Sequence, residues 1–241
     1  MKHASVSSIV RKLEFLHNPR NVEGMARYGI VARKAFGVPT PVIRAMAKDI
    51  GRNHELALKL WQTEILEARA IAALIDDPHL VTEGQMERWV KDFDSWAVCD
   101  GCCSNLFDKT DFALAKARVW SRRSEEFVKR AGFVLMAALA VHAKDLPDSV
   151  FISFLPTIVR ESEDERNFVR KAVNWALRQI GKRNIVLHRK AVTTARQIGR
   201  LPSSTARWIA ADALRELTGT AVLKRLRSRH KSSSLQKRNR L

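Results

Sequence analysis

The sequence predicts an all-helical protein made of stacked helix pairs, on three observations. Apolar and polar residues rarely alternate with period two, whereas apolar residues recur with the helical period among Ala, Leu, Arg and Glu. Tyr occurs once, Gly and Pro are few, and no Asn-Gly turn signal is present. Runs that combine a basic residue with Ala recur at intervals of about 30 to 40 residues, which is the period of stacked helical repeats. The runs are Glu67-Ala68-Arg69-Ala70, Lys129-Arg130-Ala131, Arg170-Lys171-Ala172 and Ala206-Arg207-Trp208, with the segment around Gly101 counted as the repeat between the first two.

These periods favour a HEAT- or armadillo-like α-solenoid over the alternative, an irregular all-α domain. In such a solenoid the second helix of each pair lines a concave face, which in this chain would be basic. We expect about a dozen helices, separated by short breaks rich in Gly, Pro, Asn, Asp and Ser. Ser95, Thr110, Ser124 and Ser204 each precede an amphipathic run and are candidate N-caps. The breaks are expected at Asn18-Pro19, Gly37–Pro41, Asn53, Asp76–Pro78, Phe93–Ser95, Lys109-Thr110, Arg122–Ser124, Asp145–Pro147, Glu161–Asp164, Gly181–Asn184 and Arg200–Ser204.

Composition narrows the class of protein further. The chain has 241 residues, 46% of them hydrophobic, and a formal net charge of +18. Three Cys are too few for a disulfide-stapled fold, and the longest apolar run, residues 131–141, is too short to cross a bilayer. No signal peptide is evident, so we expect a cytoplasmic protein whose first candidate partner is a polyanion.

The positive charge is distributed over both the body and the C-terminus of the chain. Residues 221–241 contain eight Lys and Arg and no acid, and we expect a basic tail that is partly disordered beyond about residue 228. Residues 1–220 are expected to form a single repeat domain. That domain carries the rest of the excess charge, which predicts a basic folded surface.

One predicted helix places an aromatic residue beside an acid. Trp96 and Asp100 are four residues apart, so they share a helical face, next to an apolar stripe of Cys99, Cys103 and Leu106. A half-shielded carboxylate beside an indole can stabilise a cation or orient a water molecule. The alternative is a surface Asp next to a core Trp.

A second predicted helix, Glu165–Lys182, places Trp175 beside its apolar arc and next to three cations, Lys171, Arg178 and Lys182. An indole among cations suits a sugar or base beside a phosphate backbone. An amphipathic-edge Trp with solvated cations is the alternative.

Arg130 lies near the start of a third predicted helix, where its charge opposes the helix dipole. We therefore expect it to face an acid of the fold or a phosphate. Cys99, Cys102 and Cys103 lack a second ligand cluster and are interpreted as buried small residues, so we predict no metal. No Gly-rich phosphate loop or nucleophile elbow is present, and we expect no cofactor.

In this order and spacing, the motifs resemble the AlkD-like family of bacterial DNA alkylation repair glycosylases with HEAT-like repeats. The resemblance covers roughly residues 10–215. It departs at Ala97, in the cysteine-rich stretch that follows, and in the basic tail. The matching pieces are Met25-Ala26-Arg27-Tyr28, Gly37-Val38-Pro39-Thr40-Pro41 with Arg44, Ser95-Trp96 with Asp100, Lys129-Arg130-Ala131, and Lys171-Ala172 with Trp175-Ala176-Leu177-Arg178.

The resemblance implies a hydrolase that cleaves the N-glycosidic bond of cationic alkylated purines, of the 7-methylguanine and 3-methyladenine type, in duplex DNA during base excision repair. It implies a concave DNA-binding face and a monomer that is bound to the nucleoid but not to a membrane. By position, Asp100, Trp96 and Trp175 fall on the catalytic set. Arg130 falls on the phosphate-contacting Arg, and Thr40 and Arg44 match positions near the DNA backbone. The other predicted DNA-binding residues are the cations beside Trp175, namely Lys171, Arg178 and Lys182. Two alternatives stay open, a non-catalytic binder of DNA structures and a protein-interaction scaffold.

Overall fold

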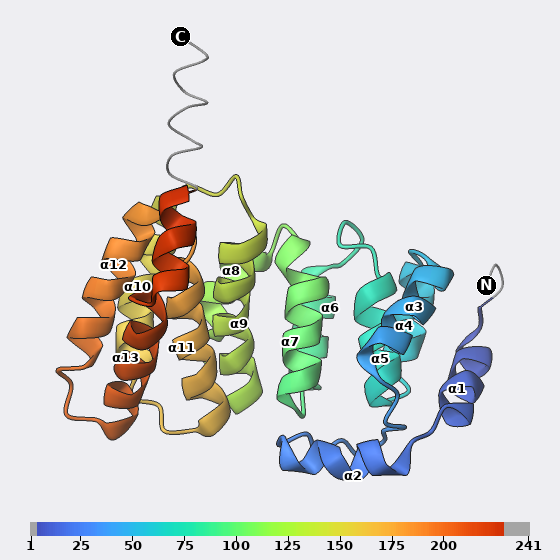
Figure 1. The fold of residues 1–241 in the computed structure, drawn as a ribbon. Helices are drawn as coiled ribbons and strands as arrows, with labels where there is room; N and C mark the ends of the chain where they lie inside the picture. Colours follow the sequence, from blue (N-terminus) through green and yellow to red (C-terminus); the bar gives the residue numbers. More distant parts are fainter. Residues whose placement is uncertain (1–3, 229–241) are drawn as a thin grey trace. The chain divides into compact units, whose positions relative to one another are not determined.

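The structure is a computed structural model that describes residues 4–228, and all the regular secondary structure in that part of the chain is helical (Figure 1). This confirms the predicted all-helical class. The chain divides into two compact units, Met1–Ala113 and Leu114–Leu241. Residues 229–241, which hold most of the predicted disordered tail, lie outside the described residues.

In the first unit, α5 packs against α4 on one side and contacts both α3 and α7, so that α3, α5 and α7 form a row. The short helix α1 packs on α4 and α5. The candidate residues of this unit lie on the row helices α3 and α7. The helices are α1 (Val6–Phe15), α2 (Pro19–Arg27), α3 (Thr40–Ile50), α4 (His54–Trp61), α5 (Leu66–Ile75), α6 (Glu83–Lys91), α7 (Trp96–Asn105) and the 3-10 helix η1 (Phe107–Lys109).

In the second unit, α9, α11 and α13 form an equivalent row, and α10 and α12 pack behind it. Residues 221–228, predicted as the first part of the basic tail, are helical, and Leu226 is buried there. The predicted pairing of helices, with every second helix in one row, is therefore present within each unit. The helices are α8 (Ala113–Trp120), α9 (Glu126–His142), α10 (Asp148–Glu161), α11 (Asn167–Gly181), α12 (Ile185–Ile198) and α13 (Ser204–Leu217).

The helix boundaries follow from local side-chain chemistry at the predicted breaks. Asn18, Asn53 and Asn184 each accept a hydrogen bond from a first-turn amide, and Pro19 occupies the first turn of α2. Two predicted caps were wrong by one residue. Glu125 rather than Ser124 precedes α9, and Ser203 rather than Ser204 caps α13.

Two other predicted caps fare differently. Ser95 does precede α7, but its hydroxyl makes no capping bond. Thr110 donates its hydroxyl proton to the Phe107 carbonyl and does not begin a helix, since α8 starts at Ala113.

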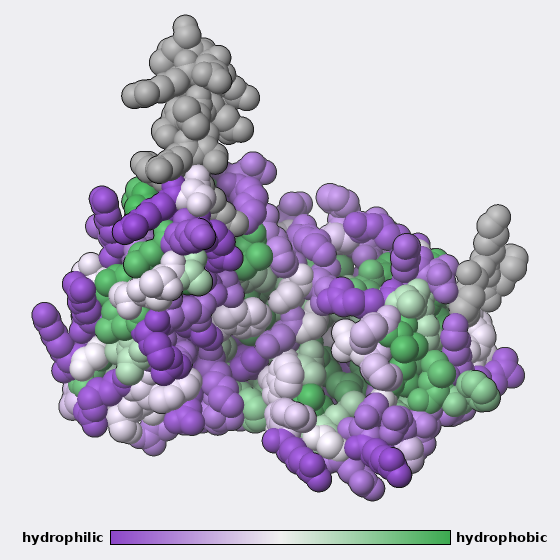
Figure 2. Space-filling model, in the orientation of Figure 1, coloured by the Kyte–Doolittle hydropathy of each residue, from purple (hydrophilic) through white to green (hydrophobic). Residues whose placement is uncertain are grey.

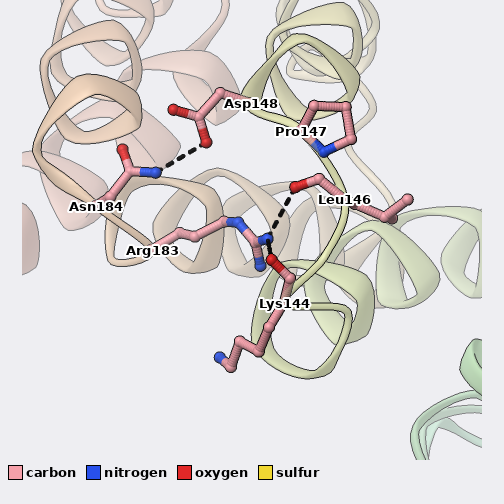
Figure 3. Close-up of a pocket in the computed structure, with 6 residues that line it drawn as sticks. All are labelled: Lys144, Leu146, Pro147, Asp148, Arg183 and Asn184. Carbon is pink, nitrogen blue, oxygen red and sulfur yellow. Dashed lines mark hydrogen bonds between the residues drawn. The ribbon is translucent and has the colours of Figure 1, made fainter. Parts of the chain in front are cut away.

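Arg183 caps the C-terminal end of α9, a largely buried helix. Its guanidinium lies 4.4 Å from the centroid of the Phe151 ring, and burial lowers the pKa of this side chain below its usual value. The last carbonyls of a helix lack hydrogen-bond partners within the helix. Hydrogen bonds from the Arg183 guanidinium supply such partners and so cap α9. Arg183 lines a cavity of about 460 Å³. Figure 3 shows residues that line this cavity, including Asn184, which donates a hydrogen bond to the Asp148 carboxylate. The guanidinium donates, at 2.8 to 3.1 Å, to the carbonyl oxygens of Ala140, Ala143, Lys144 and Leu146.

Replacing Arg183 by Met should lower the free energy of unfolding by about 2–3 kcal/mol, because it leaves several carbonyls at the end of α9 without a donor. Urea denaturation followed by circular dichroism measures the change. Arg122→Met, at an exposed position, is the matched control and should shift the value by less than about 0.5 kcal/mol. Equal stability of the two variants would contradict the capping role.

Candidate nucleic-acid interface

Trp96 and Asp100 lie on α7 as predicted, four residues apart and both half-buried. The Trp96 indole Nε1–H donates to the carbonyl oxygen of Tyr28 at 2.8 Å. Tyr28 follows α2 and is itself 74% exposed. This bond, which the sequence did not reveal, fixes the orientation of the indole ring beside an exposed aromatic residue.

Asp100 stands at the margin of the apolar stripe of α7, as the spacing predicted. Cys99 and Cys103 are fully buried on one side of it. A half-buried carboxylate is less well solvated than one in bulk water, so it attracts a nearby cation more strongly. The local geometry thus suits the stabilisation of positive charge close to the Trp96 ring.

The loop that begins α7 is held by an aromatic and cationic cluster from α4, α5 and α6. The Arg69 guanidinium is buried 5.2 Å from the Trp61 ring centroid and donates to the Asp92 carbonyl at 3.2 Å. Trp61 donates to the Asp92 carboxylate at 2.8 Å and stacks on Trp89 with ring centroids 3.9 Å apart. Asp92 lies only four residues before Trp96, so this cluster positions the start of α7.

A buried carboxylate fixes the loop that leads into α3. Glu67 is 1% exposed and accepts hydrogen bonds from the amides of Phe36, Gly37 and Val38. Its placement holds the predicted Gly37–Pro41 break, where the φ of Gly37 is 71° and a side chain would meet the Asn18 carbonyl. From the sequence, Glu67 is recognisable only as part of the repeated run Glu67-Ala68-Arg69-Ala70, and its buried role at this loop was not predicted.

Thr40 and Arg44 are exposed on α3, which begins directly after this loop. Arg44 Nη2 donates to Asn105 Oδ1 at 3.5 Å, and Asn105 in turn donates to the Gly101 carbonyl at 2.6 Å. The first unit thus brings the predicted residues Thr40 and Arg44 onto the same row of helices as Asp100.

In the second unit, α11 carries Trp175 half-buried and Lys171 exposed, as predicted. Its other two predicted cations are paired with acids of α13. Arg178 pairs with Glu216 and lies 3.7 Å from Asp212, and Lys182 also pairs with Glu216. Of the three cations predicted beside Trp175, Lys171 is exposed, whereas the charges of Arg178 and Lys182 face the Glu216 carboxylate.

Arg130 is 6% exposed in α9, and its Nη1 donates to the carbonyl oxygen of Phe168 on α11 at 2.6 Å. This bond joins two neighbouring row helices. The acid or phosphate partner that the position of Arg130 predicts stays a prediction, as does its DNA-binding role.

Sequence reasoning gave no role to Trp208 of α13, which is 39% exposed. The Arg170 guanidinium of α11 lies 5.1 Å from the centroid of its ring. The run Ala206-Arg207-Trp208 indicates a structural repeat, but it does not indicate that the Trp208 ring is exposed beside a cation. The pair adds an exposed aromatic ring to the row that carries Trp175.

The three cysteines of α7 are buried and form no disulfide. Burial, with a smaller contribution from neighbouring charge, raises the pKa of the Cys102 and Cys103 thiols well above the usual range. In residues 4–228, no group of three or more His, Cys, Asp or Glu side chains could hold a metal ion. Over the same residues, no helix is both long and apolar enough to cross a membrane.

Because the reactive form of Cys is the thiolate, Cys102 and Cys103 should not react with iodoacetamide in the native protein at neutral pH. All three thiols should react once the chain is unfolded in urea. Mass spectrometry of the alkylated peptides measures both states. Rapid native alkylation of Cys102 would show that α7 opens to solvent.

The Glu216 cluster predicts how stability depends on pH. Burial alone would raise the pKa of Glu216, but Lys182 and Arg178 outweigh it and lower the pKa below its usual 4.5. A carboxyl whose pKa is lower in the folded state stabilises the fold fully at pH values above its pKa in the unfolded chain. This contribution disappears as the pH falls through its pKa in the folded protein.

We therefore expect Glu216→Gln to lower the free energy of unfolding by about 1 kcal/mol at pH 7, after allowance for its partial exposure. The difference from the unaltered protein should vanish well below pH 4.5. Denaturation series at neutral and acid pH measure both values. A difference that persisted unchanged in acid would have another cause than the ion pairs.

Comparison with known proteins agrees with the helical repeats described above. The sequence model of a family described as "DNA alkylation repair enzyme" matches residues 9–217. Uncharacterized proteins of Listeria monocytogenes and Listeria innocua are each 23% identical over 194 residues, which covers 79% of this chain and 84% of theirs.

A solved structure described as "a new family of proteins related to the HEAT-like repeat DNA glycosylases with affinity for branched DNA structures" also matches. Its TM-score is 0.75 at 21% identity, covering 90% of this chain and 97% of that one. This likeness confirms the HEAT-like fold. The family match confirms the resemblance seen in the sequence, since it spans most of both units: the chain belongs to the DNA alkylation repair enzyme family.

Proposed function

We propose that this protein is a DNA glycosylase that removes cationic alkylated purines, such as 7-methylguanine and 3-methyladenine, from duplex DNA. The observation that carries the proposal is the half-buried carboxylate of Asp100 on the same helical face as the Trp96 indole, whose ring is fixed by the Tyr28 carbonyl. Membership of the DNA alkylation repair enzyme family supports it.

The chemistry needs little more than one acid. Alkylation at nitrogen makes the base a cationic leaving group, so the glycosidic bond breaks without strong acid assistance. The deoxyribose then carries positive charge, as in other glycoside hydrolyses with oxocarbenium-like transition states. Asp100 would stabilise that charge and orient or deprotonate the attacking water. A neutral lesion such as uracil would not leave under the same conditions.

Trp96 would lie against the sugar, and the family resemblance assigns a second sugar contact to Trp175. The electron-rich face of an indole attracts a developing cation, and its flat surface excludes bulk water from the reacting carbon. The fixed Trp96 ring supports this role, because a ring that is already oriented loses little freedom on binding. A shallow site of this kind would handle the lesion without capturing the base in a deep pocket.

The phosphate backbone would be held by the basic residues of the row helices. Lys171 and Arg44 are exposed, and Thr40 stands exposed at the start of α3. Arg178 and Lys182 would contribute from within their pairs with Glu216, which offset part of their charge. Arg130, held at Phe168, would contact a phosphate only through its small exposed edge.

A second candidate is a protein that binds branched DNA without removing a base. The solved structure with the same fold, described as having affinity for branched DNA, is the observation that favours it. Both candidates predict tight, salt-sensitive DNA binding. Only the glycosylase candidate predicts base loss that depends on Asp100. We propose that this enzyme acts as a monomer on chromosomal DNA in the cytoplasm.

Duplex DNA carrying 7-methylguanine should release the free base when incubated with the protein, and Asp100→Asn should slow release by about 10²-fold or more. DNA affinity should be unchanged or higher, because the change removes a negative charge near the backbone. Chromatography of the released base and a parallel binding titration measure the two effects.

Asp111→Asn, which neutralises an exposed acid outside the candidate site, is the control and should keep full activity. Tight binding with no base release by the unaltered protein would favour the second candidate. Full release by Asp100→Asn would remove Asp100 from the mechanism.

A further inference from the structure

A long segment of the second unit contains no acidic residue. From Arg166 to Ala211 the chain has 11 Lys and Arg residues and neither Asp nor Glu. The segment includes α11, α12 and the start of α13. Acids that neutralise its cations must therefore come from other parts of the chain.

Helix α12 separates these charges cleanly from its core face. Its buried residues pack toward α10, α11 and α13. At 3.6 residues per turn, Arg189 and Arg196 fall about 20° apart on the side of α12 opposite its buried residues, and Arg200 lies in the turn that follows the helix. We call these three residues the α12 basic stripe; all three are exposed, as is the neighbouring Lys190. The buried set is Leu187, His188, Ala191, Thr194, Ala195 and Ile198.

Several other cations of this unit are paired with acids, unlike the stripe. Lys129 pairs with Glu161 and Asp164, whereas Arg178 and Lys182 pair with Glu216. Within residues 4–228, no ion pair joins any member of the stripe to an acid. Figure 2 shows long hydrophilic side chains projecting from the edge of this unit where Figure 1 draws α12.

Unpaired like charges along one helix face are unfavourable for the helix itself, so the stripe does little for the stability of the fold. Its free charge is available to an anion. Arg189 and Arg196 are seven residues apart, or about 10 Å along the helix axis, which equals the rise of about three base pairs of duplex DNA, and Arg200 extends the stripe past the end of the helix. Arg also suits phosphate because its planar fork donates two parallel hydrogen bonds.

We propose that the α12 basic stripe binds the phosphate backbone of a second segment of duplex DNA, so that one molecule holds two duplex arms. Within the second unit, the stripe lies on the layer behind the row helices, and therefore on a different surface of this unit from Trp175 on α11. The proposal rests on the proposed DNA-binding function and adds a second contact to it.

Charge complementarity favours DNA over a membrane surface as the occupant. A membrane-binding helix needs a broad apolar face beside its cations. In α12 most apolar residues are buried in the core. Among the large hydrophobic residues described for this helix, Val186 is substantially exposed, at 50%. Binding to an anionic lipid surface is kept as an outcome of the test.

The test compares the full chain with Arg189→Ala/Arg196→Ala/Arg200→Ala. The control, Lys59→Ala/Arg88→Ala/Lys91→Ala, removes the same charge from exposed positions on α4 and α6 of the first unit. Two short unmodified duplexes, one carrying a donor and one an acceptor dye, are mixed with each protein, and energy transfer reports their joint capture. Sedimentation should find one protein for two duplexes.

The unaltered protein and the control should bring the two duplexes together. The stripe variant should do so at least about tenfold less well, and its salt dependence for the second duplex should fall by about 2 to 3 in log–log slope, one for each lost phosphate contact. Base release from a single short duplex carrying 7-methylguanine should stay the same in all three proteins.

Equal bridging by the stripe variant, or capture of only one duplex by the unaltered protein, would overturn the proposal. A stripe variant that loses binding to phosphatidylserine vesicles but still bridges duplexes would assign the stripe to a lipid surface instead. If base release fails in every protein while bridging follows the pattern above, the glycosylase proposal fails and the second DNA contact stands.

Discussion

Burial of α9 on all sides is the constraint on which the second unit depends. Residues 130–140 are all buried, so this helix cannot be stable at a surface and must be covered by its neighbours. Gly132 permits the closest approach, because a side chain there would lie 2.3 Å from the backbone nitrogen of Ser121. Helix α11 packs on α9, and α13 packs on α11. The position of Trp175 is therefore a consequence of how an apolar helix is covered, and no loop has to place it.

The sequence predicted the helix breaks well where a residue type itself dictates the backbone. Asn18-Pro19, Asn53 and Gly181–Asn184 all end or begin helices as expected. The turn between α4 and α5 was missed because no Gly, Pro or Asn marks it. There, Glu64 adopts a φ of 60°, which non-glycine residues rarely do. A contact distant in sequence, from the Leu66 amide to the Lys34 carbonyl at 2.9 Å, helps to hold that turn.

The candidate site shows the same division between local and distant information. The spacing of Trp96 and Asp100 correctly places them on one half-buried helical face, because that face is set within a single helix. The bond from Trp96 to the Tyr28 carbonyl and the clasp of Arg69 on Asp92 join positions far apart in the chain. Periodicity carries no information about such contacts. The pairing of Arg178 with Glu216 was missed for the same reason, and it changes how much of that charge is available to DNA.

Net charge alone therefore says less about a polyanion partner than the distribution of acids does. A cation paired with a half-buried acid contributes to stability, and its attraction for a phosphate is reduced by the charge it already faces. An exposed, unpaired cation has no protein carboxylate to compete with the phosphate. When it binds a DNA phosphate it therefore contributes fully to counterion release. By this criterion Lys129, Arg178 and Lys182 serve the fold in part, whereas Lys171 and the α12 basic stripe are free to act outward. Among residues 4–228, the positive charge thus divides into charge that holds helices together and charge directed at a partner.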